Sequence, residues 1–223
     1  MKYRSGILQN RFSRRMVYRN NKERQMRERL AQEAAQILAE TGSRDFFAAK
    51  RKAAEHLGAV DTRNMPSNSE IEAALMTYQR LFRADRQPQE LRRLRQVALQ
   101  AMKFFAAFRP RLVGSVLRGT ADTNSTVTLH VYAGAAEEVG LHLMENAVPF
   151  ETADRRLRFG AERYQTLPLY RFLADETPLE VIVFPLDGPH QAPLSPVDGK
   201  TMQRADIEAV ETLLAEESYN KSA

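Results

Sequence analysis

The texture of the sequence changes near Pro110, and this change constrains the fold more than any other feature. From Lys22 to about Phe108 the apolar residues recur at helical spacing. After Pro110, short runs of β-branched and aromatic residues appear, separated by Gly, Pro, Asp and Asn. The sequence therefore predicts an α+β protein, in which an N-terminal helical region packs on a small mixed β-sheet with flanking helices.

The helical region is expected to hold four helices, each with its own boundary signals. The first runs from about Lys22 to Thr41, and the second follows Ser43, a candidate N-cap. The third begins at a capping box in residues 67–70, and the fourth begins near Pro88. Each helix carries one apolar stripe, as a helix that covers a core does.

The second half of the chain is expected to alternate strands with two helices. The strands are predicted at residues 111–113, 126–132, 157–159, 164–173 and 179–185, and the helices at about 136–147 and 205–217. We therefore divide the chain into a basic flexible arm (1–21), a helical region (22–108), an α/β domain (109–218) and a disordered tail (219–223).

Positive charge is concentrated at the start of the chain. Residues 1–30 contain ten basic and two acidic residues, a local net charge of +8, whereas the whole chain carries +5. Tyr3, Phe12 and Tyr18 lie among these cations. Such a segment can follow a phosphate backbone and release counterions, so nucleic acid is one predicted partner of residues 1–30. The alternative is a solvated charged arm without a ligand.

Composition excludes several classes of site. The chain has no cysteine, which excludes disulfides and cysteine zinc sites, and its four histidines form no H-x-x-x-H pair. Gly199-Lys200-Thr201 looks like the end of a P-loop, but Leu194 stands where that loop needs glycine. No apolar stretch approaches the roughly 18 residues of a membrane span, and the start has no signal-peptide pattern. We expect a cytoplasmic protein with no membrane partner.

One segment carries a pattern that points to phosphate chemistry. Leu112-Val113-Gly114-Ser115 is typical of a strand that ends in a Gly-Ser turn, and a second glycine, Gly119, follows a short helical turn. After a polar turn, Ser125-Thr126-Val127-Thr128-Leu129 begins another strand. Residues two apart on a strand share a face, so Thr126, Thr128 and His130 are expected to point the same way.

This order of residues resembles the polymerase-β-like nucleotidyltransferase superfamily. The family pattern is Gly-Ser, a second glycine nearby, and then Ser-Asp-h-Asp-h on the next strand, with h apolar. In that family the Gly-Ser turn lets backbone N–H groups approach a nucleoside triphosphate (NTP), and the paired carboxylates bind Mg²⁺. The resemblance covers roughly Phe104 to Pro185. The whole chain, with Ala49-Lys50-Arg51-Lys52-Ala53-Ala54 in its helical half, is also similar to bacterial sequences, which implies a bacterial source.

The sequence departs from the family at the two metal-binding acids. Thr126 and Thr128 occupy those positions, and neutral hydroxyls are poor substitutes for carboxylates as Mg²⁺ ligands. Glu180 falls where the family has its third acid, and it is the one candidate catalytic residue. The alternative is an ordinary charge on a strand. No metal-ligand set is predicted, and the resemblance implies Mg²⁺ and an NTP as cofactors only if the chain is active.

The resemblance also implies a set of nucleotide-binding residues around the turn. The candidates are Gly114, Ser115, Arg118, Thr126, Thr128 and His130. We expect the Gly114-Ser115 turn to lie at the mouth of a cleft, with Thr128 and Glu180 facing it from neighbouring strands. For two candidates a simpler interpretation stays open: His130 as a structural histidine, and Arg118 as an exposed arginine.

Three functions are open on the sequence alone. The first is a nucleotidyltransferase-fold pseudoenzyme with a degenerate metal site, which binds a nucleotide or a protein partner. The second is an active nucleotidyltransferase that uses Glu180 in a non-standard metal site on an unknown acceptor. The third is a nucleic-acid-binding module led by residues 1–30. Binding that weakens steeply with salt and is lost when the arm is deleted would single out the third.

Overall fold

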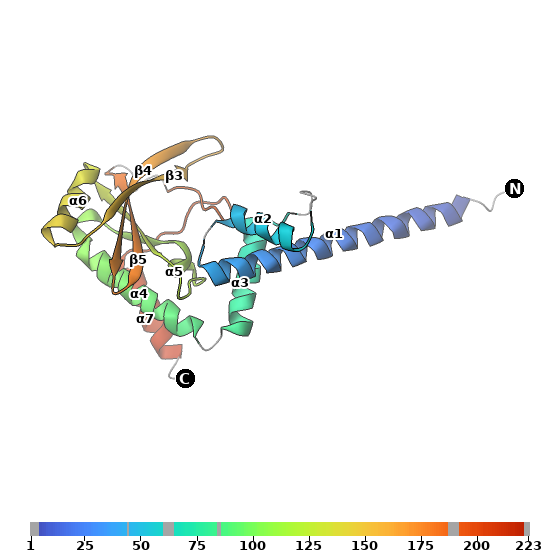
Figure 1. Cartoon of the computed structure of the whole chain (residues 1–223), viewed down its shortest axis with the longest axis horizontal. Coiled ribbons are helices and arrows are strands. Elements are labelled where there is room, and N and C mark those ends of the chain that lie inside the picture. The colour runs from blue at the N-terminus through green and yellow to red at the C-terminus, as the bar shows by residue number, and fades with distance from the viewer. Residues whose placement is uncertain (1–4, 44, 60–64, 84–85, 187–191, 221–223) are drawn as a thin grey trace. The chain divides into compact units, whose positions relative to one another are not determined.

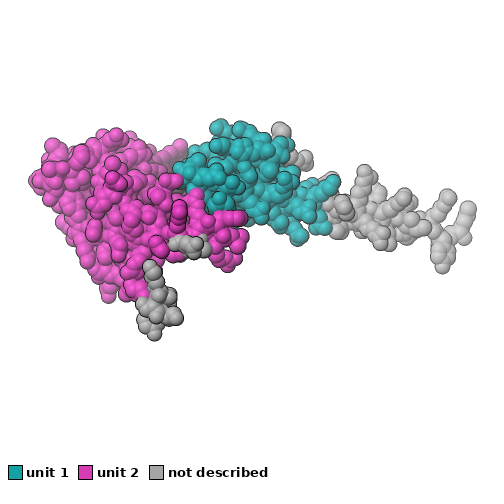
Figure 2. Space-filling model, turned by 60° about the horizontal axis from the view of Figure 1, so that its bottom comes forward, with its two compact units in different colours: residues 1–78 teal, residues 79–223 magenta. Residues whose placement is uncertain are grey.

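The computed structural model describes residues 5–43, 45–59, 65–83, 86–186 and 192–220, with side chains between residues 21 and 218 of these ranges. The protein is α+β, as predicted, and the strands of the described chain form one five-stranded mixed sheet. Two compact units are present, residues 1–78 and residues 79–223 (Figure 2). The division falls within helix α3 (Asn68–Phe82), whereas the sequence predicted a boundary after residue 108.

Unit 1 is built on a long helix, α1 (Ser5–Thr41), with α2 (Phe46–His56) and the start of α3 (Figure 1). The backbone is helical from Ser5, well before the predicted start near Lys22, so most of the expected flexible arm belongs to α1. A small core of aliphatic side chains joins the helices, formed by Leu30, Ala31, Ala34, Ala35, Ile37, Leu38, Ala49, Ala53 and Ile71. Residues 21–25 are exposed, so the described core contacts of α1 begin near Met26.

The first residues of α2 and α3 show which of the predicted N-caps form. α2 is capped by Asp45, whose Oδ1 accepts a hydrogen bond from the N–H of Ala48 at 2.9 Å, and not by the predicted Ser43. The predicted capping box of α3 is present. The N–H of Glu70 donates to Ser67 Oγ at 3.2 Å, and the N–H of Ser67 donates to Glu70 Oε2 at 2.7 Å. Ser and Asp are both good N-cap residues, so sequence alone does not separate Ser43 from Asp45.

Unit 2 is built on the mixed sheet, in the order β1-β2-β5-β4-β3. Its strands are β1 (Arg111–Val113), β2 (Val127–Ala133), β3 (Glu151–Arg158), β4 (Tyr164–Ala174) and β5 (Thr177–Pro185). β2 and β5 are parallel, and the other neighbours are antiparallel. β3 is longer than the predicted strand 157–159 because its charged first half also pairs. It lies at an edge of the sheet, where charged residues are common since they discourage pairing with another chain.

Three helices, α4 (Gln87–Phe104), α6 (Ala136–Glu145) and α7 (Ile207–Asn220), cover one face of this sheet (Figure 1). Alternate residues of the central strands, such as Leu129 and Val181, are buried against them. α4 therefore belongs to the sheet unit, although its periodicity resembles that of the preceding helices. α7 extends into the predicted tail, and residues 221–223 lie outside the described residues.

The opposite face of the sheet has an apolar end and a polar end. The apolar end is a buried cluster of Tyr132, Leu167, Leu169, Ile182 and Phe184. Thr128 and Glu180 lie on the same face, nearer the start of β2 and β5, and form the polar end. The candidate site is at the polar end.

Candidate functional site

The Gly-Ser turn follows β1 directly and forms the short helix α5 (Gly114–Arg118). Gly114 has φ of 80° and Gly119 has φ of 83°, backbone conformations that residues with a Cβ rarely adopt. The carbonyl oxygen of Ser115 accepts hydrogen bonds from the N–H groups of Gly119 and Thr120. Both glycines are thus needed for the tight turn, whatever ligand it meets.

The strand register brings the predicted residues of β2 and β5 together. Thr128 pairs with Val113 of β1 on one side and with Glu180 of β5 on the other. Paired residues of neighbouring strands share a face, so Thr128 and Glu180 face the same side of the sheet, as expected. The Gly114-Ser115 turn follows Val113 at this end of the sheet. The hydroxyl of Thr128 and the carboxylate of Glu180 therefore lie side by side on one face of the sheet.

Two arginines that the sequence analysis missed bind the carboxylate of Glu180. Arg155 Nη2 of β3 donates to Glu180 Oε2 at 2.5 Å, and Arg171 Nε of β4 donates to Oε1 at 3.1 Å. Both oxygens are engaged, and the Glu180 side chain is only 18% exposed. Since β4 lies between β3 and β5, the contact from Arg155 requires the β3–β4 hairpin to curl over this face.

These residues do not fit the magnesium site that the resemblance implied. Mg²⁺ in phosphoryl-transfer sites is held through carboxylates together with substrate phosphates. Here Thr126 and Thr128 offer neutral hydroxyls, and Glu180, the carboxylate at the position of the third family acid, is bound by two guanidinium groups. Across the part of the chain that the structure describes, no three His, Asp or Glu side chains are grouped as metal ligands.

His130 follows Thr128 on the same face but is fully buried in the apolar end. Its ring lies 4.5 Å from that of Phe184, and its Nδ1 has no hydrogen-bond partner. Burial, with a smaller contribution from the nearby cation of Arg204, lowers the pKa of His130 to about 3. The imidazole is therefore neutral at pH 7 and out of reach of a phosphate in solvent. This environment favours the structural alternative over a binding role.

A groove of about 530 Å³ opens at the polar end, where β4 ends and β3 and β5 begin. We call it the strand-end groove. Its apolar lining residues are Pro149, Phe150, Phe172, Leu173, Pro178 and Leu179, and its polar lining residues are Thr126, Glu151, Arg171 and Glu180. The expected cleft is thus only partly realised. Thr126 and Glu180 line the groove, but Gly114 does not, and Ser115 and Thr128 are buried.

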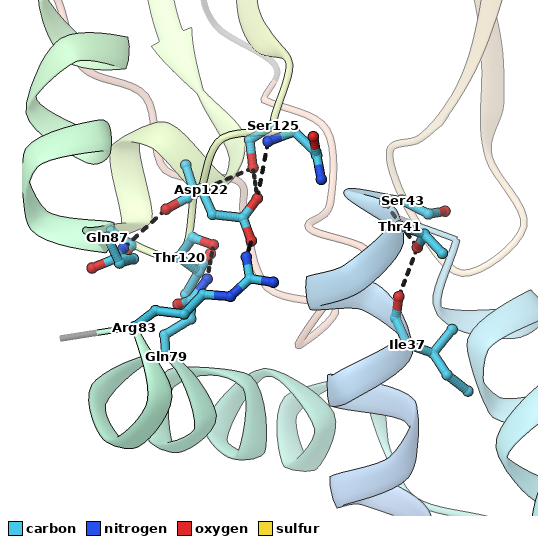
Figure 3. Close-up of polar contacts among 12 residues, drawn as sticks. Ile37, Thr41, Ser43, Gln79, Arg83, Gln87, Thr120, Asp122 and Ser125 are labelled. Carbon is cyan, nitrogen blue, oxygen red and sulfur yellow. Dashed lines mark hydrogen bonds and ion pairs between the residues drawn. The ribbon is translucent and has the colours of Figure 1, made fainter. Parts of the chain in front are cut away.

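Three further residues hold the loop between the Gly-Ser turn and β2 (Figure 3). The loop carbonyls accept hydrogen bonds from two amides: Gln79 Nε2 donates to Thr120 O at 2.9 Å, and Gln87 Nε2 donates to Gly119 O at 3.1 Å and Ala121 O at 2.9 Å. Between them, Arg83 pairs with the buried carboxylate of Asp122 at 2.8 Å. These polar side chains come from the end of α3, the residue after it and the start of α4, so helical periodicity does not predict that they lie together.

Asp122 also organises the entry to β2 (Figure 3). Its carboxylate accepts hydrogen bonds from the N–H of Asn124 at 3.3 Å and from the hydroxyl of Ser125 at 3.4 Å. The N–H of Asp122 donates to Ser125 Oγ at 2.9 Å. Ser125, which the sequence analysis matched to the family pattern, is therefore a structural residue of the loop. Arg118, at the end of α5, is partly exposed.

Comparison with protein-family models, with curated proteins and with solved structures finds no match for this chain. None of the helices in the described ranges is long and apolar enough to cross a membrane. Assignment of a function therefore depends on the residues of the polar end and of the strand-end groove.

Proposed function

We propose that this chain is a nucleotidyltransferase-fold protein that binds a nucleotide in the strand-end groove without metal-dependent nucleotidyl transfer. The observation that carries the proposal is the state of Glu180. It lies opposite Thr128 in the strand register, and Arg155 and Arg171 bind both its oxygens. A carboxylate held in this way orients two cations instead of ligating a metal ion.

Arg171 supports nucleotide binding because only its Nε–H is used in the contact with Glu180. It gives its Nε–H to Glu180, and the contacts of the described residues leave its two Nη groups for a ligand in the groove. Its side chain is 47% exposed, so a phosphate can reach it. Guanidinium groups bind phosphates through charge-assisted hydrogen bonds, and Arg171 lines the groove.

Loss of the metal site is expected to abolish turnover and to spare the fold. Stabilisation of the transition state by Mg²⁺ is worth several kcal/mol in such reactions, and a loss of about 4 kcal/mol lowers a rate nearly a thousandfold. Threonine is a good strand residue, so threonine in place of an acid at position 128 is compatible with β2, and Thr126 directly precedes that strand.

The test incubates the full chain with each NTP, Mg²⁺ or Mn²⁺ and cell extract, and measures both binding and pyrophosphate release. We expect binding by calorimetry, no pyrophosphate and no nucleotidyl group added to protein or RNA. Arg171→Met should weaken binding, whereas Arg156→Met, on the exposed side of β3, should not. Turnover that disappears in Glu180→Ala would replace this proposal with an active enzyme that has a non-standard metal site.

A second candidate function is nucleic-acid binding through α1. The observation that favours it is that the basic segment continues the helix of unit 1 without a break, and that residues 21–25 are exposed. Deletion of residues 1–20 should then abolish binding of a duplex, and affinity before deletion should fall steeply with salt. Salt-independent binding, or binding that survives the deletion, would remove this candidate.

A further inference from the structure

We infer that a second pocket, between the end of α3, the start of α4 and the loop before β2, binds a phosphate monoester. We call it the junction pocket. Its volume is about 550 Å³, within the range of small-molecule sites, roughly 300–1,000 Å³. Its polar lining residues are Arg83, Arg86, Gln87, Asp122, Thr123 and Asn124, all of them in unit 2. The junction pocket shares no lining residue with the strand-end groove, so this inference is independent of the nucleotide binding proposed above.

Two arginines give the junction pocket its positive charge. Arg83 uses Nη1 to pair with Asp122 at 2.8 Å, and the contacts of the described residues leave its Nε and Nη2 for a ligand (Figure 3). Arg86 is exposed, and its guanidinium group has no ion pair or hydrogen bond with the residues that the structure describes. Guanidinium groups form strong, charge-assisted hydrogen bonds with phosphate oxygens. The pocket therefore suits a phosphate group.

The carboxylate of Asp122 does not oppose an anion here, because its own contacts compensate it. Asp122 is 4% exposed as a whole residue, and its Oδ2 accepts the hydrogen bond of Arg83. Its Oδ1 accepts from the N–H of Asn124 at 3.3 Å and from the hydroxyl of Ser125 at 3.4 Å. With both oxygens engaged, Asp122 holds Arg83 in place and leaves the charge of Arg86 for a ligand.

Neutral donors lie beside the two arginines. Thr123 and Asn124 are exposed, and the contacts of the described residues use neither the Thr123 hydroxyl nor the Asn124 side-chain amide. The loop that carries them is fixed by Gln87, whose Nε2 donates to the carbonyls of Gly119 and Ala121. Binding groups held in place before the ligand arrives lose less entropy when it binds. The first residues of α4 add the weaker attraction of a helix N-terminus for an anion.

The rest of the lining is apolar and identifies the ligand as an ester of phosphate. Leu81 is 66% exposed and Phe82 is 71% exposed, and both line the junction pocket. A phosphate ion alone fills only a small part of the pocket. Burial of apolar surface by a ligand is favourable, so an aromatic or aliphatic group attached to the phosphate gains contact with these two side chains. The lining thus matches a phosphate monoester better than inorganic phosphate.

The experiment titrates inorganic phosphate and phenyl phosphate into the full chain at constant ionic strength, and follows the backbone amide NMR signals of Thr123 and Asn124. We expect saturable shifts of these signals, with phenyl phosphate binding several-fold more tightly. Arg86→Gln should weaken both ligands about tenfold, because it removes the unpaired cation and leaves the contact of Arg83 with Asp122 intact. The matched control is Arg80→Gln, an exposed arginine of α3 that does not line the pocket, and it should keep the wild-type affinity within about twofold.

The outcomes separate this inference from the proposed function. Shifts at Glu151 and Arg171 in place of Thr123 and Asn124 would assign phosphate to the strand-end groove and overturn the junction pocket. Equal losses of affinity in Arg86→Gln and Arg80→Gln would indicate a general attraction to positive charge, and would also overturn it. Equal affinities for the two ligands would overturn the choice of a monoester. Failure of every NTP to bind, with phenyl phosphate bound as expected, overturns only the proposed function. Thermal melting of Arg86→Gln at the wild-type temperature verifies that a loss of affinity is not a loss of fold.

Discussion

The sheet face that the helices leave uncovered has an apolar end and a polar end, and β2 and β5 contribute residues to both. At the apolar end, His130 is 1% exposed and packs against the ring of Phe184. At the polar end, Glu180 binds two arginines beside an open groove. The strand β4 supplies the difference, because it places Leu169 opposite Ile182 but Arg171 opposite Glu180. The chemistry of this face therefore depends on the β3–β4 hairpin as much as on β2.

The largest expected loss of stability comes from a substitution at the apolar end. Phe184→Ala removes a ring that is 1% exposed, and such a deletion costs about 3–5 kcal/mol of the free energy of unfolding. Chemical denaturation measures this loss. Nucleotide affinity of the folded fraction should stay at its wild-type value, because Phe184 does not line the groove. A loss below about 1 kcal/mol would mean that the apolar end is not packed as described.

The next largest effect is a pH dependence of protein stability that arises from His130 at the apolar end. The pKa of folded His130 is about 3, below the ordinary value of 6.5, so between these values the unfolded chain binds a proton that the folded chain does not. Stability from this site is complete above pH 6.5 and falls as the pH falls toward 3, by about 1.4 kcal/mol per pH unit. Denaturation between pH 7 and 5 should reveal this slope.

Two variants isolate the contribution of His130. His130→Phe should flatten the slope between pH 6.5 and 5, since it removes the titrating group and keeps a ring beside Phe184. Tyr132→Phe alters the same cluster without removing a group that titrates in this range, and should keep the wild-type slope. Equal slopes in wild type and His130→Phe would contradict the buried neutral imidazole.

The smallest effect on stability is expected at the polar end. Arg171→Met removes an ion pair whose arginine is 47% exposed, and such pairs contribute about 1 kcal/mol or less. The same variant should reduce nucleotide affinity several-fold. Denaturation and calorimetry on one preparation measure both quantities. A large loss of stability with unchanged affinity would reverse the roles assigned to the two ends.

Sequence predicted the α+β class and the position of Glu180 beside Thr128. Both features could be predicted because they depend on the periodicity of apolar residues within short segments and on the order of motifs along the chain. The arginine pair at Glu180 was not predictable in the same way. It depends on the register of β3, β4 and β5 and on the curl of the hairpin, and neither leaves a signal near Glu180 in the sequence.

The division into units escaped prediction for a similar reason. α4 has the same amphipathic pattern as the helices before it, yet its Leu94 and Met102 pack on the sheet. Periodicity identifies an apolar face but not the partner that covers it. The hydrogen bonds of Gln79 and Gln87 with the loop at residues 119–121 likewise join segments distant in sequence.

The most direct test of the central claim is the dependence of nucleotide affinity on Mg²⁺. Calorimetric titration of each NTP into the full chain is compared in excess Mg²⁺ and in excess chelator. Since Glu180 is held by Arg155 and Arg171 and two hydroxyls replace the other acids, we predict the same dissociation constant within about twofold in both conditions. Affinity that rises tenfold or more with Mg²⁺, and loses this gain in Glu180→Ala, would contradict the account.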